Sequence, residues 1–191
     1  MTAEEIDEQI TKLIVERDAL TERIEELRRT RPAETVQNYL FHTSDGEPKA
    51  LAELFGDKSD LLVIHNMGKG CSYCTLWADG FNGFVDHLES RSAFVVISPD
   101  APEVQREFAD GRGWRFKMAS AAGTTFIADM GFEMETNDFW PGVSAFHKNE
   151  DGSIERVGRD YLGPGDVYCS VWHLFGLLKD GVGDWEPRFH Y

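Results

Sequence analysis

Two cysteines of this chain have the spacing of a reactive dithiol. Cys71 and Cys74 stand three positions apart, after a Gly-rich loop and just ahead of a helix-like pattern. On a helix such positions share one face, with Cβ atoms roughly 5 to 6 Å apart, and small adjustments bring them within disulfide distance. The free N–H groups and the dipole of a helix N-terminus stabilise a thiolate. We therefore expect Cys71 to attack disulfides and Cys74 to resolve the mixed disulfide.

Two other interpretations of this pair stay open. The cysteines could be small structural residues, or they could be half of a zinc site. Cys169 and His173 are spaced i, i+4 on an expected final helix and would complete a Cys3His ligand set. They share a face opposite an apolar stripe formed by Val171, Leu174, Phe175 and Leu178. The dithiol is favoured because the pair follows a buried strand in an α/β pattern, whereas no second C-x-x-C exists.

The elements around the pair follow an α/β order. Short apolar runs bounded by turn residues predict buried strands at 61–65 and 93–98, with a helix between them that begins near the cysteines. Further strands are expected at 39–43, 143–147 and 154–157, and further helices at 50–55 (opened by Pro48), 102–109, 124–130 and 167–179. Residues 149–152 are typical of a hairpin turn. This order predicts a parallel core with an antiparallel edge.

The composition indicates a soluble protein and disfavours two classes of partner. The 191 residues carry a formal net charge of -15, and such an acidic surface repels nucleic-acid phosphates and anionic lipids. The charged residues 1–30 lack the apolar core of a signal peptide, and no apolar run is long enough to span a bilayer. Three cysteines without an export signal argue for a reducing compartment. We expect a cytoplasmic protein that binds neither nucleic acid nor membrane.

Residues 3–29 give the clearest helix prediction. Seven positions follow a 4-3-4-3-4-3 spacing, a heptad seam interrupted only by an arginine: Ile6, Ile10, Leu13, Arg17, Leu20, Ile24 and Leu27. A helix of this length extends roughly 40 Å, and Pro32 ends it. The seam would pack along the chain's own domain, form a homodimer, or lie on another subunit. The spacing alone does not distinguish these arrangements.

The residues around the cysteines resemble those of a known family. The run LLVIHNMGKGCSYCTLWADGFNG (61–83) is similar to the thioredoxin-like family called domain of unknown function 899, whose members are described as predicted dithiol-disulfide oxidoreductases. The similarity continues through GWRFKMAS (113–120), PGVSAFHK (141–148), VWHLFGLL (171–178) and DWEPRFHY (184–191). It implies a thioredoxin-like fold for residues 35–191, a central mixed β-sheet flanked by helices. Residues 1–34 would form a long N-terminal amphipathic helical extension.

The wider thioredoxin superfamily implies roles for single positions. Its nucleophile and its resolving thiol correspond to Cys71 and Cys74. A cis-proline begins the strand that faces its motif, and Pro141 stands in the matching place, so a cis peptide bond is one expectation and an ordinary trans proline the other. Where thioredoxins carry a buried carboxylate, six residues before the first cysteine, this chain has His65. His65 would relay a proton for Cys74 or serve as a hydrogen-bonded core residue.

Residues near the cysteines, and two motifs that the chain lacks, indicate what substrate and what reductant to expect. Tyr73 and Trp140 would line an apolar docking surface beside Cys71, and Lys69 adds a nearby cation. The peroxiredoxin pattern, a Thr or Ser three residues before a lone cysteine, is not present. No G-x-G-x-x-G nucleotide fingerprint occurs either. We therefore expect no bound cofactor and no catalytic metal, and a separate reductant that regenerates the dithiol.

The sequence thus predicts a thiol-disulfide oxidoreductase that acts on a protein or small-molecule disulfide. The main alternative is a non-catalytic binding or assembly module that uses the thioredoxin fold and the long helix as interaction surfaces. A structural zinc site at the cysteines would belong to that alternative.

Overall fold

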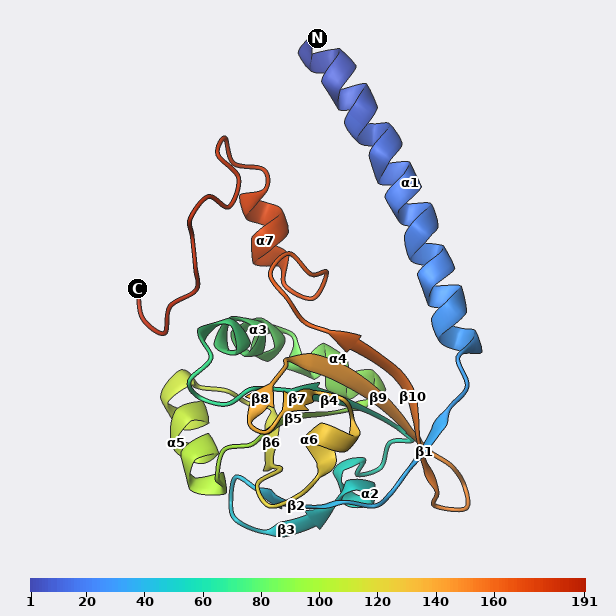
Figure 1. The fold of residues 1–191 in the computed structure, drawn as a ribbon, viewed down its shortest axis with the longest axis vertical. Helices are drawn as coiled ribbons and strands as arrows, with labels where there is room; N and C mark the ends of the chain where they lie inside the picture. The colour runs from blue at the N-terminus through green and yellow to red at the C-terminus, as the bar shows by residue number, and fades with distance from the viewer.

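A mixed β-sheet of eight strands forms the centre of the protein (Figure 1). The computed structural model describes all 191 residues. Across the sheet the strands lie in the order β1 (Glu34–Val36), β10 (Ile154–Tyr161), β9 (Gly142–Lys148), β4 (Asp60–His65), β5 (Ala93–Ser98), β6 (Lys117–Ser120), β2 (Leu40–Thr43) and β3 (Pro48–Ala50). A separate two-stranded hairpin contains β7 (Glu133–Glu135) and β8 (Asp138–Phe139).

The parallel core forms where apolar residues run continuously. β4, β5 and β6 are parallel neighbours, and Val63 lies level with Val95. Every residue of β5 is buried, as expected for a strand covered on both faces. The strands predicted at 61–65 and 93–98 are confirmed. β6 was not expected, because its four residues hold a single large apolar side chain, that of Met118.

Antiparallel strands extend the sheet on both sides. β9 pairs with β4 and β10, and β10 pairs with β1, so the predicted antiparallel edge is confirmed. Two predicted boundaries in these outer strands are wrong. β10 continues to Tyr161 because it stays paired with β9 as far as Gly142. Pro48 opens strand β3 instead of a helix, since residues 48–50 pair with β2 before helix α2 (Leu51–Leu54) begins.

Two apolar cores lie on opposite faces of the sheet. One contains Phe126 and Phe132 together with Val63 of β4. The other contains Trp77, with the neighbouring residue of β4, Ile64. Successive side chains of a strand point to opposite faces, so neighbours along β4 enter different cores. Besides α2, the helices against these cores are α3 (Ser72–Gly83), α4 (Val85–Arg91), α5 (Pro102–Arg112) and α6 (Phe126–Asp129).

The last helix is much shorter than predicted. Helix α7 spans Ser170–Phe175, against the predicted 167–179. The Asp166 carboxylate accepts hydrogen bonds from the N–H groups of Tyr168 (2.8 Å) and Cys169 (3.1 Å), and this Asx-type turn delays the helix start. The expected apolar stripe is also wrong in part, because Leu174 and Leu178 are exposed while Cys169 is buried.

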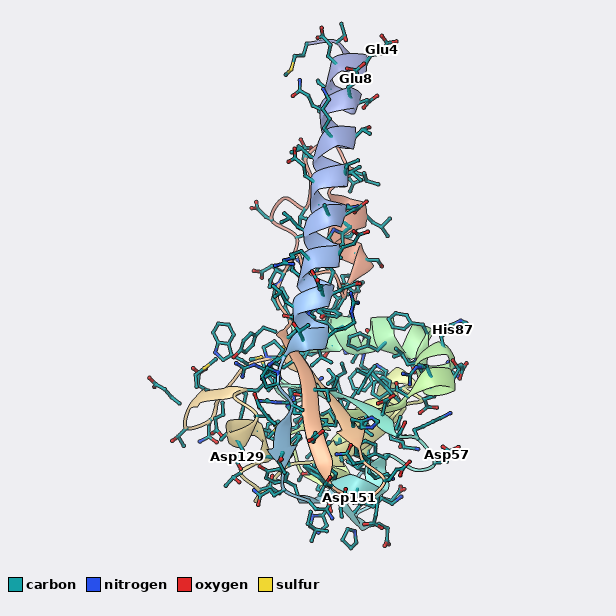
Figure 2. All side chains as sticks on the ribbon, turned by 90° about the vertical axis from the view of Figure 1, so that its right-hand side faces the viewer. Glu4, Glu8, Asp57, His87, Asp129 and Asp151 are labelled. Atoms are coloured by element: carbon teal, nitrogen blue, oxygen red, sulfur yellow. The ribbon has the colours of Figure 1, made fainter.

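The N-terminal helix α1 (Ala3–Thr30) projects from the sheet into solvent (Figures 1 and 2). Thr2 and Glu5 form a capping box: the Glu5 N–H donates to Thr2 Oγ1 at 3.2 Å, and the Thr2 N–H donates to Glu5 Oε2 at 2.8 Å. None of its residues is buried. The predicted helix is confirmed, but its seam does not pack along the chain's own sheet. None of the helices is both long and apolar enough for a membrane span.

Candidate active site

Cys71 occupies the N-cap of helix α3. Its backbone is extended (φ -98°, ψ 106°), and its Sγ accepts a hydrogen bond from the Cys74 N–H at 3.0 Å. This is the position that a Ser or Asp side chain fills in an ordinary N-cap. The N–H group that this sulfur receives at the positive end of the helix stabilises negative charge on it.

The two thiols of the pair have opposite acidities. The pKa of Cys71 is lowered from 9.0 to about 7, chiefly because the Cys74 side chain hydrogen-bonds to its sulfur, with help from the N–H groups of Cys74 and Tyr73. The pKa of Cys74 is raised, because its thiol makes that hydrogen bond and because it is buried beside the Cys71 charge. Near neutral pH, Cys71 is therefore the ionised sulfur and Cys74 the protonated one.

The loop before Cys71 is fixed by an aspartate that the sequence analysis missed. The carboxylate of Asp100, in the turn after β5, accepts a hydrogen bond from the Lys69 N–H at 2.7 Å. Gly68 has a φ of 104°, and a Cβ at this position would lie 2.9 Å from Asp100 Oδ2. The one available signal was general: loops after neighbouring parallel strands meet at the same sheet edge. The side chain of Lys69 is exposed, and its charge is not among the causes of the lowered Cys71 pKa.

An apolar groove of about 430 Å³ opens beside Cys71. Three segments far apart in the sequence form it, with these lining residues: Met67, Cys71, Tyr73, Trp77, Asp138, Phe139, Trp140, Pro141, Leu162, Gly163 and Pro164. Four of the residues singled out from the sequence therefore line one groove: Cys71, Tyr73, Trp140 and Pro141. Trp140 is 48% exposed, so its indole is available for contact with another molecule.

Pro141 stands directly before β9, in the place that the resemblance implied, but its peptide bond is trans. The structure has no cis peptide bond, so the expectation of a cis-proline is wrong and the trans alternative holds. Hydrogen bonds fix the backbone on both sides: the Trp140 N–H donates to the Phe132 carbonyl at 2.8 Å, and the Leu162 N–H donates to the Pro141 carbonyl at 3.0 Å.

His65 lies on the face of the sheet opposite the cysteines. Its ring stacks on Phe132, with a centroid distance of 3.9 Å, and its Nε2 is hydrogen-bonded to Ser144 Oγ at 2.9 Å. Burial lowers the pKa of His65 to about 3, with a smaller effect from the charge of Arg156. Cys74 belongs to the other apolar core. This position agrees with the core role of His65 and does not bring it to Cys74 as a proton relay.

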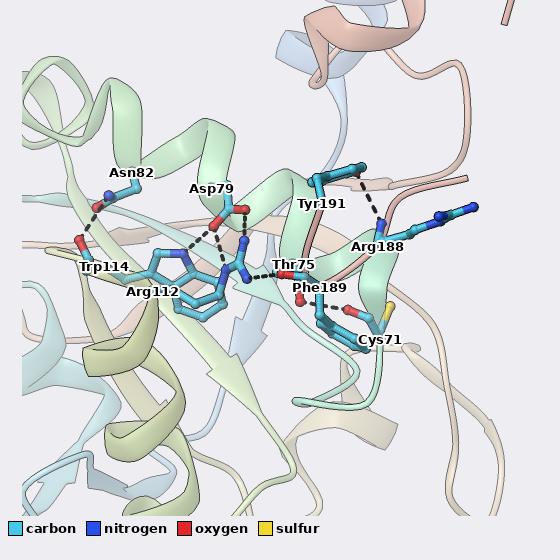
Figure 3. A network of polar contacts seen from close by, with 10 residues as sticks. Cys71, Thr75, Asp79, Asn82, Arg112, Trp114, Arg188, Phe189 and Tyr191 are labelled. Carbon is cyan, nitrogen blue, oxygen red and sulfur yellow. Dashed lines mark hydrogen bonds and ion pairs between the residues drawn. The ribbon is translucent and has the colours of Figure 1, made fainter. Parts of the chain in front are cut away.

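A network of hydrogen bonds joins helix α3 to other segments of the chain (Figure 3). Arg112 of α5 donates from Nε to Asp79 Oδ1 at 2.9 Å and from Nη1 to the Phe189 carbonyl at 3.0 Å. Trp114 donates from Nε1 to the same Asp79 oxygen at 2.7 Å. The network thus ties α3, α5 and the C-terminal tail together behind Cys71. Sequence reasoning missed it, because each of its hydrogen bonds joins residues that are 33 or more positions apart.

The proposed zinc ligands do not come together. Cys169 is buried in the same core as Cys74 and Trp172, and burial raises the pKa of its thiol. His173 is exposed, with Nε2 at 3.0 Å from the Asp166 carbonyl. No three His, Cys, Asp or Glu side chains are grouped closely enough to hold a metal ion. The Cys3His arrangement, one of the two alternative interpretations, is therefore not formed.

The fold resembles that of several solved structures. Peroxidoxin BcpB from Mycobacterium tuberculosis has a TM-score of 0.53 at 23% identity, over 64% of this chain and 80% of that one. A peroxiredoxin-like protein from Aquifex aeolicus has a TM-score of 0.55 at 15% identity (68% and 75% covered). A thiol peroxidase from Chromobacterium violaceum has a TM-score of 0.54 at 14% identity (69% and 76% covered). At these identities the likeness establishes the fold, and the expected thioredoxin-like fold is confirmed.

The sequence itself identifies the family. No curated protein matches it. The family model described as "Bacterial protein of unknown function (DUF899)" matches residues 2–181, a range that includes helix α1, the dithiol and Cys169. The family suggested by the run 61–83 is thus confirmed, while the tail 184–191 lies beyond the match. This chain belongs to the DUF899 family of bacterial proteins.

Proposed function

We propose that this chain is a thiol-disulfide oxidoreductase whose dithiol is Cys71 and Cys74. The observation that carries the proposal is the unequal pair at the start of α3. A half-exposed sulfur with a lowered pKa borders a groove, and a buried thiol one turn later keeps its proton. Thiol-disulfide exchange needs this asymmetry, because the attacking sulfur must be ionised and accessible while the resolving sulfur stays protonated until the mixed disulfide exists.

In the proposed reaction the Cys71 thiolate attacks one sulfur of a substrate disulfide. The substrate S–S bond breaks, and its other sulfur leaves and takes up a proton from water. Cys74 then loses its proton and attacks Cys71 Sγ, which releases the second substrate sulfur. The substrate gains two electrons and two protons, and the chain keeps a Cys71–Cys74 disulfide. A separate thiol reductant returns the pair to the dithiol.

The same hydrogen bond explains the timing of the second step. The raised pKa of Cys74 depends on its hydrogen bond to the Cys71 sulfur and on the charge of that sulfur. When Cys71 enters a mixed disulfide, its charge disappears and both effects are lost. The pKa of Cys74 then falls, so this thiol ionises only when there is a bond for it to attack.

The groove beside Cys71 indicates that the substrate disulfide has apolar neighbours. Its walls carry the aromatic side chains of Tyr73, Trp77 and Trp140, which suit apolar groups on either side of a disulfide. A disulfide with apolar or aromatic neighbours, in a protein or in a small molecule, fits this environment best.

Peroxide reduction is the second activity to test, since the fold neighbours include peroxiredoxins. The chain departs from the peroxiredoxin pattern at the residue three positions before Cys71, which is Gly68 and has no hydroxyl group. Its φ of 104° also strains any Ser or Thr placed there. This departure favours disulfides over peroxides as the oxidant.

The test is a glutathione redox titration followed by intact-protein mass measurement. Wild-type protein should lose the mass of two hydrogen atoms reversibly. C74S should stop at one bound glutathione, located at Cys71, and C71S should not react. The matched control is C169S, which removes the third thiol and should behave like wild type because Cys169 is buried.

Two outcomes would overturn the proposal. Thiols that stay unreactive at every potential, or one tightly held zinc ion per chain, would support the binding-module alternative. Rapid consumption of hydrogen peroxide by Cys71, with no reaction of disulfides, would replace the proposed activity with a peroxidase.

A further inference from the structure

Helix α1 carries an apolar seam that nothing in its own chain covers. Six of the seven seam positions are Ile or Leu, and each of these six side chains is exposed: Ile6, Ile10, Leu13, Leu20, Ile24 and Leu27. A lone helix with such a stripe on water is unfavourable, whereas a heptad seam is buried when a second helix lies against it. The seam therefore points to a partner helix with the same spacing.

The charges beside the seam distinguish the two orientations of a helix pair. If Ile6 is a d position, Glu16 and Arg23 are g positions, and Asp7 and Arg28 are e positions. In a parallel pair each g residue faces the e residue five positions later in the other helix, so Arg23 would meet Arg28. In an antiparallel pair g faces g and e faces e. Glu16 then meets Arg23, Asp7 meets Arg28, and both contacts occur twice.

The seam residues themselves also favour the antiparallel orientation. Parallel helices would place Arg17 opposite the Arg17 of the other copy. Antiparallel helices in the register that pairs Glu16 with Arg23 place Arg17 opposite Leu20, Ile10 opposite Leu27, and Leu13 opposite Ile24. The arginine then packs its methylene stem on a leucine and keeps its charged end in water.

We propose that two copies of this chain form an antiparallel coiled coil through α1. The second copy is the occupant because its own seam and its own charges complement this helix at every charged e and g position. Residues 6 and 31 of different copies then lie side by side. The two sheet domains stand about 37 Å apart along the helix axis, at opposite ends, from the rise of 1.5 Å per residue over 25 residues.

The first test compares a seam variant with a matched control in sedimentation velocity across a concentration series. Leu13→Asp should weaken the dimer roughly a hundredfold or more, because it places a carboxylate in the seam of both copies. Val15→Asp is the control: Val15 is 64% exposed against 62% for Leu13, but it occupies an f position and faces away. V15D should remain a dimer, and both variants should keep wild-type iodoacetamide reactivity at Cys71.

The second test fixes the orientation, using the Glu16–Arg23 pair because Arg23 is paired only with Glu26 of its own helix, whereas Arg28 is tied to Asp160 of β10. In the antiparallel pair R23E creates two Glu–Glu contacts and should weaken the dimer about tenfold. The double variant E16R/R23E should recover wild-type affinity to within about threefold. In a parallel pair R23E would instead tighten the dimer, by removing Arg23 from Arg28.

Three results would overturn the inference: a wild-type chain that stays monomeric, a dimer that L13D leaves intact, or an R23E variant that dimerises more tightly. None of these depends on the redox chemistry, because the measured quantity is the mass of the sedimenting species.

Discussion

The acidity of Cys71 gives the most direct test of how the site works. Its pKa of about 7 arises first from the Cys74 side chain, so Cys74→Ala should raise it towards the ordinary value of 9.0. The lowered value should make roughly half of Cys71 thiolate at pH 7, compared with about 1% for a thiol of pKa 9.0. Full reversion would therefore cut the thiolate fraction about fiftyfold at pH 7.

Reactivity should change less than the thiolate fraction does. A thiolate of higher pKa is a stronger nucleophile, with a Brønsted coefficient of about 0.45, and two pKa units then give a factor of about 8. Full reversion thus predicts C74A to react about sixfold more slowly at pH 7 and about eightfold faster above pH 10. These are upper limits, because the N–H groups of Cys74 and Tyr73 still stabilise the sulfur in the variant. The two rate profiles must cross.

The assay is alkylation of Cys71 by iodoacetamide from pH 5 to 11, followed by mass spectrometry. Both proteins carry Cys169→Ser, so that C74A/C169S has a single thiol. C74S/C169S should fall between them, since a serine hydroxyl can still donate to the sulfur. A wild-type midpoint above about 8.5, or profiles for C74A and wild type that coincide, would refute the role assigned to Cys74.

Three further predictions concern the surroundings of the pair. The pKa of His65 is lowered to about 3, so the contribution of this residue to stability is present above pH 6.5 and is lost as the pH falls. Urea titrations of wild type and His65→Gln between pH 6 and 4 test this. The unfolding free energy of wild type should fall more steeply, by about 1.4 kcal/mol per pH unit relative to the variant. Gly142→Ala puts a Cβ 2.0 Å from the Phe132 ring and should cost at least about 1–3 kcal/mol in the same assay. Gly158→Ala, whose nearest contact is 3.6 Å, should stay within about 0.5 kcal/mol of wild type. Trp140→Ala should slow the formation of a mixed disulfide with an aromatic-flanked peptide disulfide about tenfold. Alkylation of Cys71 by iodoacetamide should stay unchanged. Equal slowing of both reactions would contradict the role of the groove in binding the substrate.

Local patterns were sufficient for much of the fold. The continuous apolar runs of β4 and β5 and the heptad spacing of α1 are properties of a few neighbouring residues, and the structure has these elements where they were expected. The position of Cys71 at a helix start is local in the same way, because it follows from a Gly-rich loop that leads into an apolar helical stripe.

The remaining features depend on contacts between distant segments. β6 is a strand because it pairs with β5 and β2, although its own residues have no strand pattern. The shortened α7 reflects the turn at Asp166, and the hydrogen-bond network beside α3 joins Asp79 to Arg112 and, through Arg112, to the C-terminal tail. Spacing within a segment contains no information about such pairings, so sequence reasoning missed them.

The placement of His65 shows why a matching position need not have a matching role. Where thioredoxins carry a buried carboxylate, this chain has His65, and its sequence position is compatible with a proton relay or with a hydrogen-bonded core residue. β4 directs Ile64 and His65 to opposite faces of the sheet. His65 stacks on Phe132 in the core away from Cys74, and burial there keeps its imidazole neutral. No side chain of that strand then adjusts the acidity of the pair. The unequal acidities must come from the pair itself and from the helix N-terminus, so the alkylation midpoint of Cys71 should stay near pH 7 in His65→Gln and rise in Cys74→Ala.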